Sequence, residues 1–349
     1  MKKTLLLLFI ITIFKSSFSQ EEINVLWLGN SYTYVNNLPE MINELCIGTD
    51  RSVKHESVTP GGCTLFQHEV SATSLNAIRK GGWDYVVLQE QSQLPSIDYY
   101  RHNAMRPSYQ ALYDTIMTYN PEAMVVGYMT WGRQYGGQQC VNFGQGTYCS
   151  ADFVDFNHMQ DTMSVAYCEN AYATDSYVAP VGDAWKEALN NHPELVLHSS
   201  DQSHPSYDGS YLAACVFHAV FWKESPIGTY HSSNIDKDKA TLLQTIASDV
   251  VFNNLEKWNI KIDTTDVKDN IKEENFSIIS NPNDDTITIK NKKNSAALVK
   301  IININGMIIE EKEIFNDDVI TIKNSKGIYI IQIIEKENSN NFVQKIIKL

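Results

Sequence analysis

The stretch VLWLGNSYTYVNNLPEMI, residues 25–42, decides the fold of the first part of this chain. The apolar run Ile23–Leu28 is typical of a parallel strand that is buried on both faces. The triplet Gly29, Asn30 and Ser31 follows it, and a helical pattern begins at Leu38. In folds built this way, chemistry lies outside the carboxyl ends of the strands. Ser31 is therefore either a nucleophile at a strand end or part of an ordinary turn.

Strand and helix patterns alternate through the rest of this first region. Parallel strands need crossover connections, so the alternation predicts an α/β fold with a parallel sheet covered by helices. The expected strands are Ile23–Leu28, Val53–Val58, Tyr85–Leu88, Met124–Tyr128 and Tyr177–Val181. The expected helices are Leu38–Ile47, Leu65–Lys80, Tyr109–Tyr119, Phe153–Ala173 and Tyr211–Lys223.

The composition changes near Trp258. Beyond residue 260 there is no Trp, Cys or His, and Ile, Asn, Lys and Asp dominate. Ile alternates there with Lys or Thr, and an Asn-Gly pair stands at 305–306, so this region predicts a small antiparallel β-sandwich. We expect a first domain over 21–260, a linker over 261–275 and a second domain over 276–349, which suits a prior of roughly 150 residues per domain.

The first 20 residues have the features of a secretory signal peptide: Lys2 and Lys3, an apolar run from Leu5 to Phe14, and small residues before the expected cleavage point. The alternative is a membrane anchor, but this run is only about half of the roughly 20 residues that a span needs. Cleavage would change the formal charge from −13 to −16, because three lysines leave with the peptide. Such an acidic surface excludes nucleic acid and anionic membranes as main partners, and no integral membrane segment is expected in the mature chain.

All six cysteines follow the signal peptide, and an oxidising compartment permits disulfides. Cys140 and Cys149 flank the glycine-containing loop CVNFGQGTYC and are the pair that we expect to be bonded. Cys215 lies in a long apolar run, where a buried free thiol is usual. No Cys or His spacing is typical of zinc, and the chemistry considered below needs no cofactor.

A serine hydroxyl is a weak nucleophile near neutral pH and needs a base with an orienting partner. The segment SSDQSHPS, residues 199–206, precedes the last expected helix and contains Asp201 and His204. With this spacing in a tight loop, the carboxylate can hold one imidazole nitrogen while the other faces Ser31. The alternative is a helix cap with a surface histidine.

The motifs LGNSYT and DQSHPS resemble the first and last sequence blocks of the SGNH (GDSL-like) hydrolase superfamily, and the resemblance covers residues 23–226. It implies a three-layer α/β/α, flavodoxin-like fold and esterase activity. Ser31 would be the nucleophile, His204 the general base and Asp201 its orienting partner. Asn30 replaces the Asp of the family's GDS motif, which indicates a divergent subfamily, and no GxSxG nucleophile elbow is present.

The resemblance also implies an oxyanion hole with three donors. The first is the Ser31 N–H, and the second is a glycine N–H of the segment VTPGGCTL, where Gly62 is preferred to Gly61 and a plain type II turn is the alternative. The third is an asparagine side chain, but this chain has QEQSQ at residues 89–93. A glutamine would have to donate, and Gln91 is preferred to Gln89 because it lies further past the strand end.

Three further residues are candidate substrate contacts. Trp131 and Arg133 follow the fourth strand, where Trp131 is either a platform for a sugar ring or part of the packing. Glu90 is either a buried cap or a substrate contact. The loop from Gly132 to Cys149 is a candidate wall of the substrate site.

The tail, residues 276–349, resembles the C-terminal sorting domain of type IX-secreted proteins, on its Asn-Pro, NG and GIY motifs and its basic end KIIKL. This implies type IX secretion machinery as a partner and a cell-surface or released protein; a carbohydrate-binding sandwich is the alternative. Together, the motifs predict a secreted serine esterase that hydrolyses small acyl esters, in particular acetyl esters on a carbohydrate. The alternatives are a lipid or aryl esterase and a non-catalytic carbohydrate-binding protein of the same fold.

Overall fold

The structure is a computed structural model of the 349-residue chain. It describes residues 21–142, 146–261, 276–280, 286–292, 295–303, 308–321, 327–336 and 341–348. The predicted signal peptide and almost all of the predicted linker lie outside the described residues.

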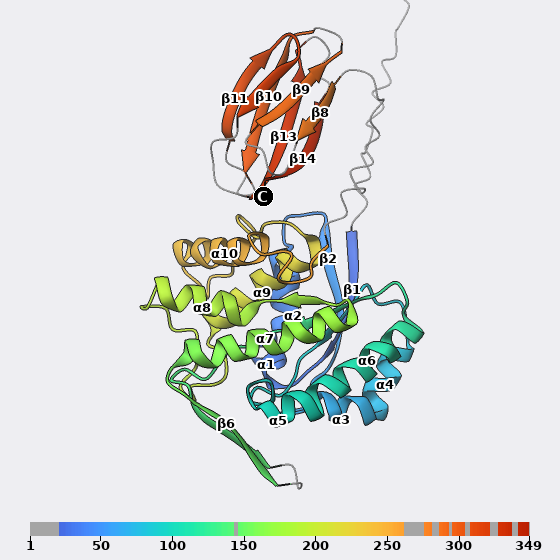
Figure 1. Ribbon diagram of the computed structural model, residues 1–349, viewed down its shortest axis with the longest axis vertical. Helices are drawn as coiled ribbons and strands as arrows, with labels where there is room; N and C mark the ends of the chain where they lie inside the picture. The colour runs from blue at the N-terminus through green and yellow to red at the C-terminus, as the bar shows by residue number, and fades with distance from the viewer. Residues whose placement is uncertain are drawn as a thin grey trace, which may run out of the picture.

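The first region contains a five-stranded parallel sheet in the order β2-β1-β3-β4-β7 (Figure 1). The strands are β1 Glu21–Leu28, β2 Arg51–Val58, β3 Tyr85–Leu88, β4 Met124–Tyr128 and β7 Tyr177–Ala179. The predicted α/β, flavodoxin-like order is confirmed. The chain leaves β1 toward β2 and returns to β3 on the other side, so the segments after β1 and β3 lie next to each other at the carboxyl edge. Open α/β sheets bind ligands at such a switch point.

Helices cover both faces of this sheet. One group contains α2, α9 and α10, in which α9 packs on the other two; in the other group, α3 and α4 pack on α6, and α6 packs on α7 (Figure 1). The longer helices are α2 Leu38–Leu45, α3 Leu65–Val70, α4 Ala72–Arg79, α6 Arg106–Tyr119, α7 Phe156–Thr174, α8 Val181–Asn191, α9 Tyr207–Trp222 and α10 Lys237–Phe252. Shorter turns are η1 Val35–Asn37, η2 Leu94–Ser96, α5 Asp98–Tyr100 and η3 Arg101–Met105.

Several predicted elements differ from the structure at their ends; α9, for example, begins at Tyr207 and not at Tyr211. The helix expected over Leu65–Lys80 is broken at Ser71, which ends α3 and whose side chain accepts the N–H of Ser74 as the cap of α4. The strand expected to reach Val181 stops at Ala179, because the chain turns at Pro180 into α8. Helices α8 and α10 had no predicted counterpart.

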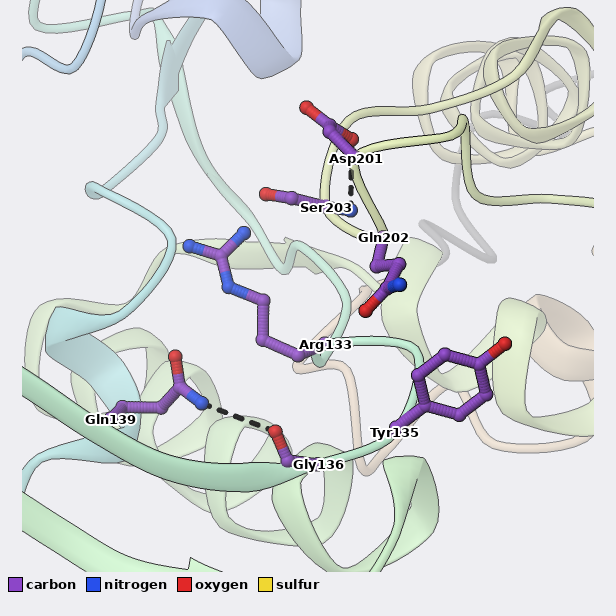
Figure 2. A pocket seen from close by; sticks show the side chains of 7 residues that line it. All are labelled: Arg133, Tyr135, Gly136, Gln139, Asp201, Gln202 and Ser203. Carbon is purple, nitrogen blue, oxygen red and sulfur yellow. Dashed lines mark hydrogen bonds between the residues drawn. The ribbon is translucent and has the colours of Figure 1, made fainter.

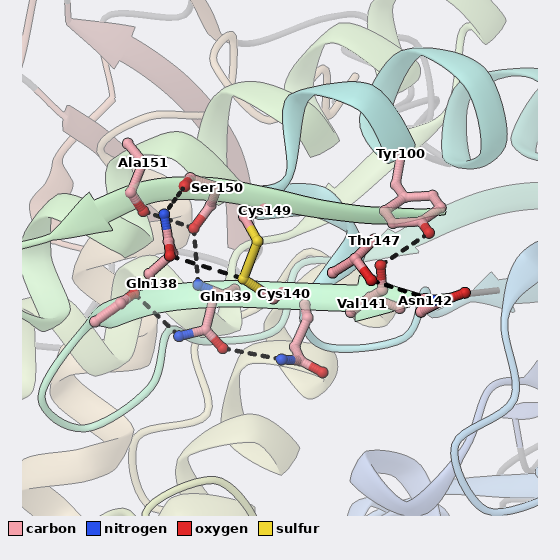
Figure 3. Close-up of a disulfide and its surroundings, with 12 residues drawn as sticks. Tyr100, Gln138, Gln139, Cys140, Val141, Asn142, Thr147, Cys149, Ser150 and Ala151 are labelled. Carbon is pink, nitrogen blue, oxygen red and sulfur yellow. Dashed lines mark hydrogen bonds between the residues drawn. A yellow bond between two sulfur atoms is a disulfide. The ribbon is translucent and has the colours of Figure 1, made fainter. Parts of the chain in front are cut away.

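The expected loop wall between Gly132 and Cys149 is largely an antiparallel hairpin. Its strands are β5 Gly137–Asn142 and β6 Thr147–Phe153, and the hairpin projects from the body of the domain (Figure 1). Cys140 and Cys149 lie opposite each other and form the predicted disulfide, with an S–S distance of 2.03 Å (Figure 3). The Tyr100 hydroxyl donates to the carbonyl of Val141 at 3.0 Å, which ties the hairpin to α5.

The second region is built of antiparallel strands in two sheets, β11-β10-β13-β14 and β12-β9-β8. Alternate residues of the strands, including Ile289, Val299 and Ile331, are buried between them, as the period-two pattern predicts. The strands are β8 Phe276–Ser280, β9 Thr286–Asn291, β10 Ala297–Asn303, β11 Ile308–Ile314, β12 Asp318–Thr321, β13 Gly327–Glu335 and β14 Asn341–Lys348. Across the described residues of both regions, no helix has the length and apolarity to span a membrane.

Candidate active site

Ser31 is the first residue of α1, a single helical turn over Ser31–Tyr34 that follows β1 directly. The Asn30 side chain caps this turn by accepting the Tyr32 N–H at 3.1 Å, and its amide donates to the Cys63 carbonyl at 2.9 Å. A carboxylate could not make the second bond, which gives Asn30 a structural role of its own. At Gly29 a Cβ atom would lie 2.7 Å from the Gln89 side chain, so the turn needs glycine there.

Ser31, His204 and Asp201 form a hydrogen-bonded chain. The Nε2 atom of His204 lies 2.9 Å from the Ser31 Oγ, and its Nδ1 bonds to Oδ2 of Asp201. The other Asp201 oxygen accepts the backbone N–H groups of Ser203 and His204 and the hydroxyl of Ser199, at 2.9–3.0 Å. Partial burial raises the pKa of Asp201, but these bonds, led by that from the His204 ring, outweigh it and hold the pKa below its usual range. Asp201 is therefore an ionised acceptor that fixes the imidazole.

The loop that carries Asp201 and His204 is followed by α9, and η1 is hydrogen-bonded to the start of that helix. The Asn36 side chain donates to the Ser206 carbonyl at 3.1 Å and to the Ser210 hydroxyl at 2.9 Å. The cap of α9 is Ser206, whose side chain accepts the Gly209 N–H. Of the two roles considered for the DQSH segment, capping thus falls to Ser206, and His204 is left to face Ser31.

Trp131 belongs to the packing and not to a sugar platform. Its side chain is 1% exposed and is stacked between the rings of Tyr32 and Trp185, at centroid distances of 4.7 and 3.9 Å. Its indole N–H donates to the Ser203 carbonyl at 2.9 Å. Trp131 therefore supports the His204 loop from below, and both faces of its ring are covered.

Arg133 lies beside this stack and is partly exposed. It donates to the Tyr32 hydroxyl at 2.8 Å and to the Ser92 hydroxyl at 3.1 Å. It also lines an open pocket of about 370 Å³, together with Asp201 and Ser203 (Figure 2). Of the three candidate substrate contacts, Arg133 is the one whose polar end reaches a cavity.

The backbone donors expected for an oxyanion hole lie at two turns. The Ser31 N–H belongs to the first position of α1, where no preceding turn can accept it. Gly62 has φ +68°, and the Cys63 N–H bonds to the Pro60 carbonyl at 3.1 Å, as in a type II turn. Within the described part of the chain, no protein acceptor binds either the Ser31 or the Gly62 N–H. Gly62 thus lies in a type II turn, which was the alternative to an oxyanion-hole role. In this turn the Gly62 N–H is left without a protein acceptor among the described residues, so the turn is compatible with both roles.

The two glutamines considered as a third donor differ sharply in surroundings. Gln89 is fully buried: its oxygen accepts from the Asn30 N–H and the Thr33 hydroxyl, at 2.8 and 3.1 Å, and its amide donates to the Glu90 carbonyl. Gln91 is partly exposed, and its amide makes only a long bond of 3.3 Å to Gln93. Gln89 is therefore fixed by hydrogen bonds to the Ser31 turn, whereas the side-chain amide of Gln91 still has an N–H that can donate to a substrate.

Glu90 is a buried cap and not a substrate contact. One carboxyl oxygen accepts the N–H of Leu65, at the start of α3, and that of Gln91, at 3.1 and 2.7 Å. Complete burial raises the pKa of Glu90 to about 7, against the opposing effect of these two bonds. The other oxygen has no partner among the described residues.

Sequence reasoning missed His68, which lies on the buried side of α3. Its Nε2 is 2.9 Å from the Gly29 carbonyl and its Nδ1 is 2.8 Å from the Ser74 hydroxyl. Burial lowers the pKa of His68, which favours the neutral ring, and the ring joins the Gly29 turn after β1 to α4. The available signal was a histidine in the helical pattern of LFQHEV. The residues that the structure describes contain no group of three or more His, Cys, Asp or Glu side chains placed to hold a metal ion.

The tail of the chain matches a known family. Residues 277–349 match the family described as "Secretion system C-terminal sorting domain". The tail is thus similar to secretion sorting domains. This family match confirms the predicted resemblance of the tail and implies export through secretion machinery. No curated protein matches the chain.

Solved structures resemble the α/β region. A DUF4886 family protein from Bacteroides uniformis ATCC 8492 is 18% identical, with a TM-score of 0.52, over 66% of this chain and 95% of that one. A putative SGNH hydrolase from Slackia heliotrinireducens is 26% identical (TM-score 0.44; 57% and 98% covered). A putative GDSL-like lipase from Parabacteroides merdae ATCC 43184 is 12% identical (TM-score 0.38; 57% and 94% covered). The similarity to the first of these structures shows a shared fold for the α/β region.

Proposed function

We propose that this chain is a secreted serine esterase. The observation that carries the proposal is the hydrogen-bonded chain from Ser31 Oγ through both nitrogens of His204 to Asp201. A serine hydroxyl bonded to an imidazole, which is itself held by a carboxylate, is the arrangement that activates serine for acyl transfer.

In this mechanism Ser31 Oγ attacks the ester carbonyl while His204 Nε2 takes its proton. The tetrahedral intermediate collapses, the ester C–O bond breaks, and His204 returns the proton to the departing alcohol. Water then attacks the acyl-serine by the same route and releases the acid. Asp201 stays ionised and stabilises the imidazolium, because its pKa lies below the usual range.

The developing oxyanion needs donors that are already in place. We assign the N–H groups of Ser31 and Gly62 and the side-chain amide of Gln91 to this role. Each such donor contributes on the order of 3 kcal/mol to transition-state stabilisation. The exposure of Gln91 and the full commitment of Gln89 favour Gln91 as the side-chain donor.

We further propose that the substrate is a small acyl ester, in particular an acetyl ester on a carbohydrate. This proposal rests on the resemblance and on the sorting tail, because an enzyme outside the cell would meet glycans there. We infer that the signal peptide is removed and that type IX machinery carries the chain to the surface or the medium.

The test compares Ser31→Ala with the parent on p-nitrophenyl acetate. We expect kcat/KM to fall at least about 10⁴-fold, because the triad acts as a unit. Ser233→Ala, at an exposed serine, is the matched control and should keep parental activity. A fluorophosphonate should add one label to the parent, by intact mass, and none to Ser31→Ala.

Equal turnover by parent and Ser31→Ala would reject the triad. A parent that is neither active nor labelled would favour the non-catalytic binding protein. Rates on acetylated polysaccharides against long-chain esters then separate the carbohydrate esterase from a lipid esterase.

A further inference from the structure

Arg133 is a partly buried cation that has no carboxylate partner within the described chain. The two other partly buried arginines each have one: Arg51 pairs with Glu224, and Arg101 pairs with Glu169. The Arg133 guanidinium bonds only to neutral hydroxyls, those of Tyr32 and Ser92. This is unusual in a chain with 41 acidic residues against 28 Lys and Arg.

The guanidinium also has donors to spare. Of its five N–H groups, two are engaged by these hydroxyls. The two hydroxyls hold the fork in place, and the planar fork matches a carboxylate with two parallel bonds. Arg133 is thus oriented by its neighbours without being neutralised by them.

The pocket beside Arg133 is open to a ligand. Figure 2 shows the side chains of Arg133 and Gln202, which come from different loops, and among the described residues that line the pocket Arg133 is the only cation. Asp201 is the one acidic residue there, and both of its oxygens already accept hydrogen bonds from its own loop and from His204. The positive charge of Arg133 is therefore not neutralised by any carboxylate among the described residues of this pocket.

Tyr32 connects Arg133 to the Ser31 and His204 side chains. The Tyr32 hydroxyl receives the Arg133 bond, and its ring lies edge-on to the His204 ring at a centroid distance of 5.3 Å. Tyr32 also follows Ser31 directly in α1. A group bound by Arg133 would therefore lie beside the residue that follows Ser31, a position that one small molecule with its ester at Ser31 would span.

We propose that Arg133 selects esters that carry a carboxylate on the alcohol part, such as an acetylated acidic sugar. This inference rests on the proposed esterase function, and it specifies that the preferred ester is negatively charged. The acidic surface repels anions in general, so selection would come from this local contact.

The test uses two acetyl esters of nearly the same shape, 4-acetoxybenzoate and 4-acetoxybenzamide. We expect the parent to have a higher kcat/KM for the anionic ester, and Arg133→Gln to lower the ratio of the two values about tenfold. The ratio removes any general damage caused by loss of the Tyr32 contact. Arg133→Lys should keep part of the preference, and added salt should weaken it.

The matched control is Arg79→Gln. Arg79 is exposed at the end of α4, which runs away from the carboxyl edge, so this change alters the net charge equally but should leave the ratio unchanged. An unchanged ratio in Arg133→Gln, or no preference in the parent, would overturn the inference.

A binding measurement separates this inference from the esterase proposal. Ser31→Ala protein is titrated with 4-hydroxybenzoate and with 4-hydroxybenzamide, followed by NMR. Tighter binding of the benzoate, lost on adding Arg133→Gln, supports the anion site even if neither ester is hydrolysed. Equal binding of both probes rejects it, whatever the parent hydrolyses.

Discussion

The carboxyl edge of the sheet holds two polar groups that differ in exposure. In the outer group, Ser31 and His204 are partly exposed and Asp201 is exposed, and a bond between segments far apart in the chain links Ser31 to His204. The inner group contains Gln89 and Glu90, which are fully buried and bond to the backbone of the turns around them. The residues of the proposed catalytic chain and the residues that support their turns are neighbours at this edge. They differ in burial: the supporting side chains are fully buried, and the catalytic ones are not.

Asp201→Asn tests the outer group most strongly. We expect kcat to fall on the order of 10⁴-fold, because an asparagine amide facing Nδ1 favours the wrong imidazole tautomer. Thermal unfolding should change little, since the asparagine oxygen can still accept the two backbone N–H groups. A loss below tenfold on p-nitrophenyl acetate would mean that Asp201 does not orient His204.

Gln89→Ala tests the inner group. It removes a buried side chain and leaves the Asn30 N–H and the Thr33 hydroxyl without their acceptor, so we expect a loss of about 3 kcal/mol in the free energy of unfolding. Urea denaturation measures this. An unchanged midpoint and slope would show that Gln89 is not part of the support of the Ser31 turn.

Gln91→Ala is the matched change on the exposed side of the same segment. We expect an unfolding free energy within about 0.5 kcal/mol of the parent, as for most surface substitutions. We expect kcat to fall up to roughly 10²-fold through loss of an oxyanion donor. If Gln91→Ala lowered the stability and left kcat unchanged, Gln91 would be a supporting residue and not an oxyanion donor.

Glu90→Gln tests the burial of the inner group through the pH dependence of the free energy of unfolding. Burial raises the folded-state pKa of Glu90 from 4.5 to about 7, so the folded state keeps a proton that the unfolded chain releases. The stability that this proton provides is complete below about pH 4.5 and is lost as the pH rises through 7. The glutamine variant should therefore be more stable than the parent at pH 8, by on the order of 2 kcal/mol, with a flatter profile between pH 4.5 and 7. Parallel profiles in urea titrations would contradict this.

The strands and the outer group were predictable from sequence for a physical reason. Each parallel strand is a short apolar run, and four of the five observed strands end at the residue predicted. The placement of His204 next to Ser31 followed from its pairing with Asp201 in a loop before a long apolar helix.

The inner group was not predictable, because the segment QEQSQ is polar throughout and its pattern does not indicate which side chains turn under the sheet edge. Trp131 had two possible roles for a similar reason: an aromatic residue after a strand can face solvent or fill a layer. Its burial depends on Tyr32 and Trp185, which come from distant parts of the chain.

The bond between Ser31 and His204 joins residues 173 positions apart. During synthesis the chain emerges with its first strand early and the His204 loop late. The serine stays unactivated throughout that interval, and the loop cannot dock until α1, Trp131 and Trp185 are all in place. The order of the sequence thus delays the assembly of the proposed catalytic residues until the domain has folded.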